Sequence, residues 1–273
     1  MNHRFTYVTG IVATATLTVA LSACGGGATS TTTSGGYTVT LVDEEKLTVC
    51  TNLPYVPFQY EEDGDIVGFD VDLMDLVADE LGVEQEIVDL KFDSIESGAA
   101  MTGDKCDLAA AGITITDDRK PNLTFSEPYF EETLAFLTAD GETIDSIDEV
   151  KERDLTLGVQ SATTSFNHAV DNGMDPTQFE DSGKQLQALR SGTIDVILQD
   201  EPVINEWMSD SDNADAFEVG GTVETGEQYG FAFKKDADET LVEVVNDTIS
   251  AARSDGTYDE LYEQWFGAES GES

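Results

Sequence analysis

The sequence predicts an α/β protein built from two similar lobes. Between residues 47 and 113, short β-rich runs alternate with helical patterns in the order βαβαβ, which is typical of a parallel sheet flanked by helices. The alternation restarts near Leu155. When both ends of the chain are set aside, about 220 residues remain, which suits one large or two small domains. We therefore expect two lobes in series, with a cleft between them where the carboxyl ends of the strands meet.

The first lobe is expected to begin with a strand at Leu47–Thr51. The helix at Asp70–Leu81 has its apolar residues on one face, and Gly82 is a natural stop. The remaining elements expected here are a strand at Gln85–Leu90, a helix at Ile95–Thr102 and a buried strand at Cys106–Ile113.

The second lobe repeats this plan. Its strands are expected at Leu155–Val159, Gln178–Glu180 and Asp195–Leu198, and its helices at Thr164–Asn172, Gly183–Ser191 and Pro202–Ser209. An amphipathic helix at Glu239–Ser254 and a helix at Tyr258–Phe266 follow. Two crossover strands, near Glu132–Ala139 and Gln228–Phe233, are expected to join the lobes.

The N-terminus has the pattern of an export signal. Arg4 precedes an apolar and small-residue run from Tyr7 to Leu21 without acids or bases, and Cys24 follows Leu-Ser-Ala. This order is typical of a secretory signal peptide and too short for a membrane span. The four residues Leu21–Cys24 resemble a bacterial lipobox, in which Cys24 is diacylated and anchors the protein to a membrane. The alternative is an ordinary signal peptide with a cysteine nearby.

A tether is expected after Cys24. The run Gly25–Gly36 contains only Gly, Ala, Ser and Thr, so it should be flexible, with Tyr37–Glu45 as a loose lead-in to the folded part. The domain plan is then a signal peptide at 1–23, a tether at 24–45, a folded part at 46–267 and a loose tail at 268–273.

The chain is strongly acidic. It has 56 Asp and Glu against 13 Lys and Arg, a formal net charge of −43, and the acids are spread along its length. Nucleic acid is not an expected partner, because phosphate binding needs basic patches. The charge suits salty surroundings, where repulsion is screened over about 10 Å or less, and a halophilic source is a hypothesis.

Residues for catalysis or metal binding are scarce. The sequence has no Gly-rich phosphate loop, and its only histidines are His3 and His168, so no metal, no cofactor and no Ser-His-Asp triad are expected. Cys50 and Cys106 form an even pair in an oxidising compartment. Either a disulfide or two buried thiols would fit them.

Arg119 stands out against this background. It lies just past a predicted strand end, with Gly112 and the hydroxyls of Thr114 and Thr116 before it. Small residues let backbone N–H groups approach a ligand, threonines add donors, and a planar guanidinium holds a carboxylate through two hydrogen bonds. The pattern favours a carboxylate receptor. The alternative is a surface ion pair in an acid-rich protein.

Eight motifs resemble the polar-amino-acid family of bacterial periplasmic solute-binding proteins, the extracellular solute-binding family 3. In the first half they are YVPFQY at 55–60, GFDVDLMDLVADELG at 68–82, GITITDDR at 112–119 and FSEPYF at 125–130. In the second half they are LGVQSATTS at 157–165, DVILQDEPVI at 195–204, QYGFAF at 228–233 and DGTYDELYEQWFG at 255–267. They follow the family's order over nearly all of residues 46–267, and glutamine-binding members are the most similar.

The resemblance implies the type II fold of periplasmic binding proteins, in which two α/β lobes are joined by two crossover strands around a ligand cleft. Lobe 1 would comprise 46–135 and 229–267, and lobe 2 would comprise 136–228. The implied protein is an extracytoplasmic, lipid-anchored and monomeric binding subunit of an ABC importer, and not an enzyme. It would close on an amino acid and present it to the permease subunits in the membrane.

The family's roles for the charged ends of the ligand carry over to five positions. Arg119 matches the arginine that binds the α-carboxylate, and Asp200 matches the aspartate that accepts from the α-ammonium. Gly112 and Thr114 match positions that hydrogen-bond the ligand from the first lobe. Thr164 matches a second-lobe position of the carboxylate clamp.

Four more positions match residues around the ligand side chain. Tyr55 and Phe92 match aromatic residues that sandwich its aliphatic stem, and Asn52 and Gln160 match positions that face its end. Many relatives have an aspartate in place of Asn52, and some have a lysine in place of Gln160. These neutral amides favour a neutral, hydrogen-bonding side chain such as that of glutamine.

Two other functions are compatible with this scaffold, because a fold does not fix function. One is a cyclohexadienyl or prephenate-type dehydratase. The other is the sensor domain of a larger receptor, against which the lipobox argues.

Cys24→Ser should release or misprocess the protein, because the serine hydroxyl cannot replace the thiol that accepts the lipid. Ligand affinity should stay at the wild-type level. Membrane fractionation and mass spectrometry of the mature N-terminus measure both effects. Unlipidated wild-type protein in the culture medium would contradict the anchor.

Overall fold

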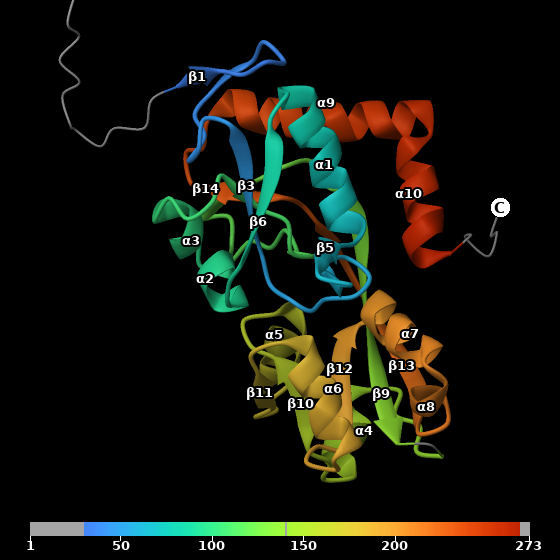
Figure 1. Cartoon of the computed structure of the whole chain (residues 1–273). Helices are drawn as coiled ribbons and strands as arrows, with labels where there is room; N and C mark the ends of the chain where they lie inside the picture. Colours follow the sequence, from blue (N-terminus) through green and yellow to red (C-terminus); the bar gives the residue numbers. More distant parts are fainter. Residues whose placement is uncertain (1–29, 140, 268–273) are drawn as a thin grey trace, which may run out of the picture.

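The computed structural model describes residues 30–139 and 141–267. The signal peptide expected at 1–23, Cys24 and the tail at 268–273 lie outside the described residues. Figure 1 shows two lobes, each built on a sheet with helices packed against it. In the part of the chain described, no helix is both long and apolar enough to span a membrane.

The first lobe contains a five-stranded sheet in the order β6-β3-β7-β14-β8. Its strands are β3 (Lys46–Thr51), β6 (Glu84–Asp89), β7 (Leu108–Ala109), β8 (Leu123–Phe125) and β14 (Ala232–Lys234). β3 runs parallel to β6 and β7, whereas β14 is antiparallel to both of its neighbours. The strand expected at Cys106–Ile113 is shorter than predicted, because the chain leaves the ladder after Ala109 and turns at Gly112, whose φ is 54°.

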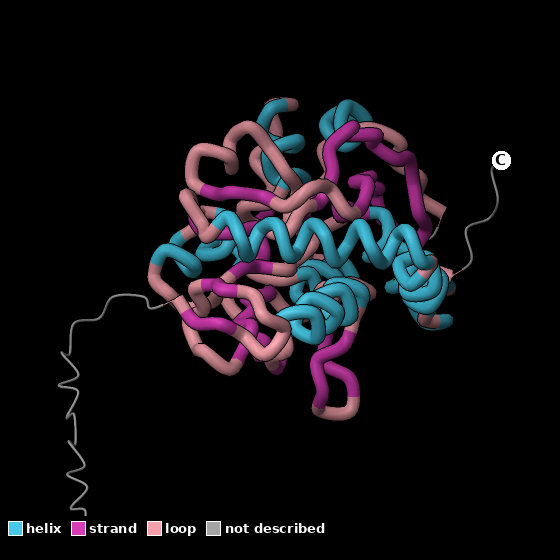
Figure 2. The backbone as a smooth tube through the Cα atoms, turned by 90° about the horizontal axis from the view of Figure 1, so that it is seen from above, coloured by secondary structure: helices cyan, strands magenta, loops and turns pink. Residues whose placement is uncertain are grey.

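Five helices accompany this sheet: α1 (Phe69–Leu81), α2 (Phe92–Glu96), α3 (Ala99–Thr102), α9 (Glu239–Asp255) and α10 (Thr257–Phe266). α9 crosses the end of the lobe farthest from the second lobe (Figures 1 and 2). The single helix expected at Ile95–Thr102 is wrong. Gly98, at a φ of 76°, separates α2 from α3. A hairpin of β4 (Tyr60–Glu62) and β5 (Asp65–Val67) was not predicted.

The second lobe contains a sheet in the order β11-β10-β12-β9-β13. Its strands are β9 (Phe130–Ala139), β10 (Leu157–Gln160), β11 (Thr177–Phe179), β12 (Val196–Asp200) and β13 (Phe217–Tyr229). Its helices are α4 (Ile147–Glu152), α5 (Thr164–Asp171), α6 (Ser182–Arg190), α7 (Glu201–Ser209) and α8 (Ser211–Ala214). β10, β11 and β12 are mutually parallel, as the repeated βα pattern predicts.

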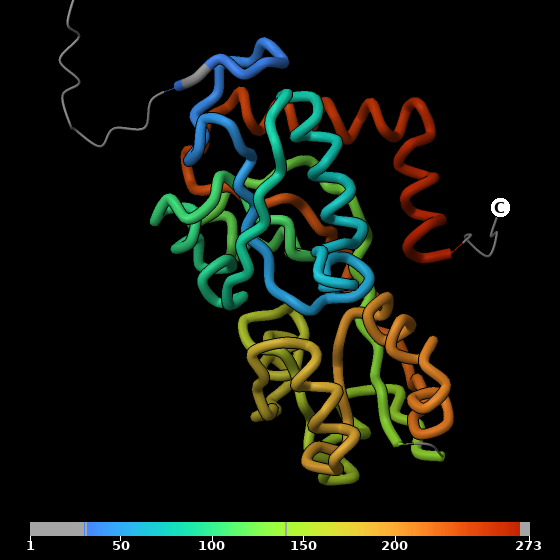
Figure 3. Tube along the Cα trace, in the orientation of Figure 1, coloured from blue at the N-terminus to red at the C-terminus, as the bar shows by residue number. Residues whose placement is uncertain are grey.

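β9 and β13 carry the chain between the lobes (Figure 3). They pair antiparallel from Phe217 opposite Ala139 to Tyr229 opposite Phe130. The first expected crossover lies within β9. The second is longer than expected, because β13 begins at Phe217, and the chain re-enters the first sheet at β14. The lobe boundaries proposed after 135 and 228 fall inside these two strands and remain predictions.

The N-terminal segment packs onto the first lobe. β1 (Thr31–Thr32) pairs with β2 (Thr38–Val39), and Val39 and Leu41 are buried in the core. The Gly35 N–H donates to the carbonyl of Leu81 at 2.9 Å. The expected tether to Gly36 and the lead-in at Tyr37–Glu45 are therefore wrong for the described residues. Two apolar side chains gain burial, and a carbonyl at the end of α1 gains the donor it needs.

Cys50 and Cys106 are joined by a disulfide, with 5.6 Å between their Cα atoms. Of the two states that the sequence left open, this structure has the bonded one. The bond ties the carboxyl-terminal part of β3 to the loop that precedes β7.

Asp70 links α1 to the loop that contains Gly112. Its side chain is 1% exposed, and its carboxylate accepts from the Gly112 N–H at 2.9 Å and from the Tyr129 hydroxyl at 2.7 Å. Burial raises the pKa of Asp70 to about 7, against the lowering effect of these two hydrogen bonds.

Asp70→Asn should make the free energy of unfolding less dependent on pH. The pKa of Asp70 is about 7 in the folded protein against 3.8 ordinarily, so its contribution to stability is full below pH 3.8 and is lost as the pH rises through 7. Wild type should therefore lose up to about 4 kcal/mol of unfolding free energy through Asp70 between acid and neutral pH, and Asp70→Asn should not show this decrease. Urea unfolding without ligand from pH 4 to pH 8 measures it.

Asp79→Asn is the matched control, because Asp79 lies in the same helix and is exposed. It should keep the wild-type pH dependence. The same slope in Asp70→Asn would contradict the raised pKa of Asp70.

Candidate functional site

All nine residues predicted from the sequence line one pocket between the lobes. They are Asn52, Tyr55, Phe92, Gly112, Thr114, Arg119, Gln160, Thr164 and Asp200, and Gln59, Ala111 and Thr163 join them. Most lie where a strand ends or a helix begins: Asn52 follows β3, Gln160 ends β10 and Asp200 ends β12. The two sets of strand ends face each other, as is expected for ligand sites of α/β sheets.

The pocket is closed and narrow. Its cavity volume is about 10 Å³, because side chains of the two lobes fill the space between them. The Gln160 amide donates to Asn52 Oδ1 across the cleft at 2.8 Å, and the Tyr55 hydroxyl donates to the Asp200 carboxylate. The Ser182 hydroxyl donates to the Pro54 carbonyl at 2.6 Å. The lobes are therefore in contact, and the polar groups of the site bond to one another.

Arg119 is the positive end of the pocket. Its side chain is 3% exposed, which rules out the alternative of a surface ion pair. Its guanidinium donates to the carbonyls of Thr114 at 2.8 Å and Ala162 at 2.9 Å, one from each lobe, and lies over the Phe92 ring. The nearest carboxylate, that of Glu96, is 3.8 Å from its Nε. Burial lowers the pKa of Arg119, but a guanidinium keeps its charge in proteins. A buried cation with such loose pairing favours an anionic ligand group.

Asp200 is the negative end, on the second lobe. It is 5% exposed, and burial raises the pKa of its carboxyl to about 7. The hydroxyl of Tyr229 approaches it and lowers this pKa without reaching hydrogen-bonding geometry. Oδ1 of Asp200 has no hydrogen-bond partner among the described residues. It is an acceptor for which an ammonium group would be a suitable donor.

The amide end of the pocket offers acceptors. The Asn52 Nδ2 donates to the Leu90 carbonyl at 2.9 Å, which fixes the orientation of that amide. Asn52 Oδ1 then accepts from Gln160 Nε2, so Gln160 must turn its Oε1 away from Asn52. Oε1 of Gln160 and Oε1 of Gln59 are both buried without a donor in the part of the chain described. A ligand with N–H donors would satisfy them.

Gly112 contributes through its backbone. Its φ is 54°, and a Cβ there would come within 2.8 Å of the Tyr55 ring, so only glycine fits. Its N–H already donates to Asp70. What it can offer a ligand is therefore its carbonyl oxygen.

Sequence reasoning missed Glu132, which is 3% exposed. Its Oε1 accepts from the Thr114 hydroxyl at 2.6 Å and from the Thr164 hydroxyl at 2.7 Å. The alternation of β9 contains the signal, because Phe130, Glu132 and Leu134 lie on one buried face while Glu131 is exposed.

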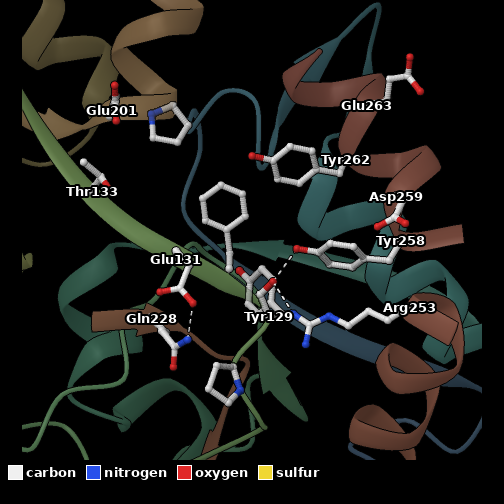
Figure 4. A pocket seen from close by; sticks show the side chains of 13 residues that line it. Tyr129, Glu131, Thr133, Glu201, Gln228, Arg253, Tyr258, Asp259, Tyr262 and Glu263 are labelled. Atoms are coloured by element: carbon white, nitrogen blue, oxygen red, sulfur yellow. Dashed lines mark hydrogen bonds between the residues drawn. The ribbon is translucent and has the colours of Figure 1, made fainter. Parts of the chain in front are cut away.

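A larger pocket, of about 730 Å³, lies outside this site (Figure 4). It lies beside β9 and α10, and its carboxylates belong to Glu131, Glu201, Asp259 and Glu263. None of the nine predicted residues lines it. Among the described residues, no group of three His, Cys, Asp or Glu is arranged to hold a metal ion.

Residues 47–268 match the family model of the bacterial extracellular solute-binding proteins, family 3. A probable histidine-binding protein of Neisseria gonorrhoeae is 31% identical over 229 residues, which cover 82% of this chain and 84% of that protein. The L-cystine-binding protein of Escherichia coli strain K12 is 30% identical over 218 residues, or 79% and 80% of the two chains.

Solved structures agree with this. An ancestral arginine-binding protein bound to arginine has a TM-score of 0.75 at 35% identity, over 82% of this chain and 99% of that one. An ancestral arginine-binding protein bound to glutamine has a TM-score of 0.75 at 33% identity, over 82% of this chain and 98% of that one. An ancestral amino acid-binding protein, a precursor of cyclohexadienyl dehydratase, has a TM-score of 0.72 at 33% identity, over 81% and 95%.

Proposed function

Because the chain belongs to family 3 of the bacterial extracellular solute-binding proteins, we propose that it captures a polar L-amino acid between its lobes for an ABC-type importer. The carrying observation is the pair of opposite charges in one closed pocket: a loosely paired Arg119 and an Asp200 with a free acceptor oxygen. A zwitterion presents the complementary charges. Relatives named for histidine, cystine and arginine make an amino acid the ligand class to test.

The side-chain end favours a ligand that donates hydrogen bonds. Gln59 and Gln160 each leave a buried carbonyl oxygen without a donor, and such an oxygen costs about 1–3 kcal/mol. The amide of glutamine brings two N–H donors and no charge. Glutamine therefore remains the favoured ligand.

Delivery requires the lobes to open and close. β9 and β13 form the connection, and a hinge there would expose the pocket and then enclose the ligand. The permease subunits and the lipid anchor on Cys24 complete this proposal, with the protein at the outer face of the cell membrane.

Calorimetry against the common amino acids tests the function, and three matched ligands test the side-chain end. Glutamine should bind more tightly than glutamate, whose charge would meet acceptors, and more tightly than methionine, which has no donor. Small-angle scattering should show a compact protein with saturating ligand. Absence of binding by every amino acid, together with turnover of prephenate, would favour the dehydratase instead.

Arg119→Ala and Asp200→Ala should each weaken amino-acid binding by roughly two orders of magnitude or more. Removing one partner of a buried charge pair costs about 2–5 kcal/mol, and about 1.4 kcal/mol is tenfold in Kd. Calorimetry measures the loss, and circular dichroism checks the fold. Lys120→Ala is the control, because this neighbouring cation is exposed and pairs with Asp117.

The two variants should also differ in selectivity. Arg119→Ala should discriminate less against ligands with an amidated α-carboxyl, and Asp200→Ala less against ligands without the α-amine. A folded alanine variant that binds within about threefold of wild type would remove that residue from the site.

A further inference from the structure

Glu132 accepts hydrogen bonds from two threonine hydroxyls that are expected to contact the ligand. We define the carboxylate clamp as Arg119 and Thr164, which match the residues that bind the α-carboxylate, together with Thr114, which matches a first-lobe position that hydrogen-bonds the ligand. In this structure the hydroxyls of Thr114 and Thr164 both donate to Glu132 Oε1, at 2.6 Å and 2.7 Å. A threonine hydroxyl has a single proton to donate. Both protons are therefore used by a carboxylate of the protein itself.

The rest of this carboxylate is poorly satisfied. Glu132 is only 3% exposed, so its Oε2 has little access to water, and this oxygen has no hydrogen-bond partner in the part of the chain described. Arg119 is near enough for the negative charge of Glu132 to act on the pKa of its guanidinium. However, Arg119 donates its hydrogen bonds to two backbone carbonyls and not to Glu132. Among the described residues, two hydroxyls on one oxygen are thus the hydrogen bonds that hold this side-chain carboxylate.

Glu132 lies at an irregular position in β9. Glu131 pairs with Gln228 and Thr133 pairs with Glu224, so three residues of β13 lie opposite Glu132 alone. Such a bulge redirects a side chain and weakens the ladder locally. The two threonines come from different lobes, so Glu132 also connects the lobes at the point where they are joined.

From these contacts we propose that Glu132 is a built-in competitor of the ligand: its carboxylate occupies the clamp and holds the lobes together until a ligand carboxylate displaces it. The displacement of Glu132 by a ligand rests on the proposed function, whereas its role in holding the lobes together does not. Affinity is then set partly by how readily Glu132 leaves, because a protein whose binding-competent state is sparsely populated binds less tightly.

The test compares Glu132→Ala and Glu132→Gln with wild type. Without ligand, small-angle scattering should show both variants more open than wild type, since the connection between Thr114 and Thr164 is lost or weakened. Calorimetry with L-glutamine, L-arginine and L-histidine should show tighter binding, by about 5-fold to 150-fold for alanine and less for glutamine, the usual range for coupled groups. The α-carboxamides of the same amino acids should gain little.

Glu131→Gln is the matched control. It removes the same charge one residue away, on the exposed face, where Glu131 accepts from the Gln228 amide (Figure 4). It should leave both the scattering profile and the affinities unchanged.

The outcomes separate the two proposals. If the Glu132 variants bind these amino acids more weakly than wild type, the carboxylate accepts from the ligand ammonium and the competitor is refuted. Unchanged compactness without ligand refutes its connecting role. If no variant binds any of the three amino acids, the proposed function fails for them, while the scattering of the ligand-free variants still decides whether Glu132 holds the lobes together.

Discussion

The burial of one guanidinium between two lobes is the constraint on which this structure depends. A charge away from water must find partners, and Arg119 has one carbonyl from each lobe, the Phe92 ring and the Glu96 carboxylate at 3.8 Å. The bond to the Ala162 carbonyl therefore depends on the closed arrangement of the two lobes. The same closure buries Asp200, whose pKa rises to about 7, and leaves acceptor oxygens on Gln59 and Gln160 without donors. The closed pocket is consequently complementary to a molecule with an anion, a cation and N–H groups.

The two crossover strands determine how this complementarity can be used. β9 and β13 pair along most of their length within the second sheet, and their register shifts at two places, between Val219 and Thr222 and, opposite Glu132, between Glu224 and Gln228. An irregular ladder has fewer hydrogen bonds to lose when the backbone bends. The position that carries a carboxylate into the clamp is thus also a position where the connection between the lobes can change. Glu132 thus both bonds to the threonines of the clamp and lies at an irregular position in the connection between the lobes.

The sequence predicted the elements whose pattern is local. α1 and α9 have a clear apolar face and end at glycines, and their observed bounds lie within one residue of those expected. Short strands were less predictable, because the length of β7 depends on the neighbours with which it pairs. Seven of the nine pocket residues lie in the quoted motifs, whose order specifies an arrangement that periodicity alone does not, whereas Asn52 and Phe92 lie outside them. Glu132 was missed because an acidic residue in a strand ordinarily faces solvent, and its partners lie 18 and 32 residues away in the chain.

The packing of the N-terminal segment sets how far the cleft can lie from a membrane. Residues 30–45 belong to the first lobe through the β1–β2 pair and the contact of Gly35 with the end of α1. On the proposal that Cys24 carries a lipid, residues 24–29 connect the anchor to the first described residue, and six residues reach about 20 Å when fully extended. An anchor of that reach would hold the first lobe close to the bilayer and leave the second lobe free to move relative to it. Capture and hand-over would occur within a thin layer above the membrane, where each binding protein meets the same few transporters repeatedly.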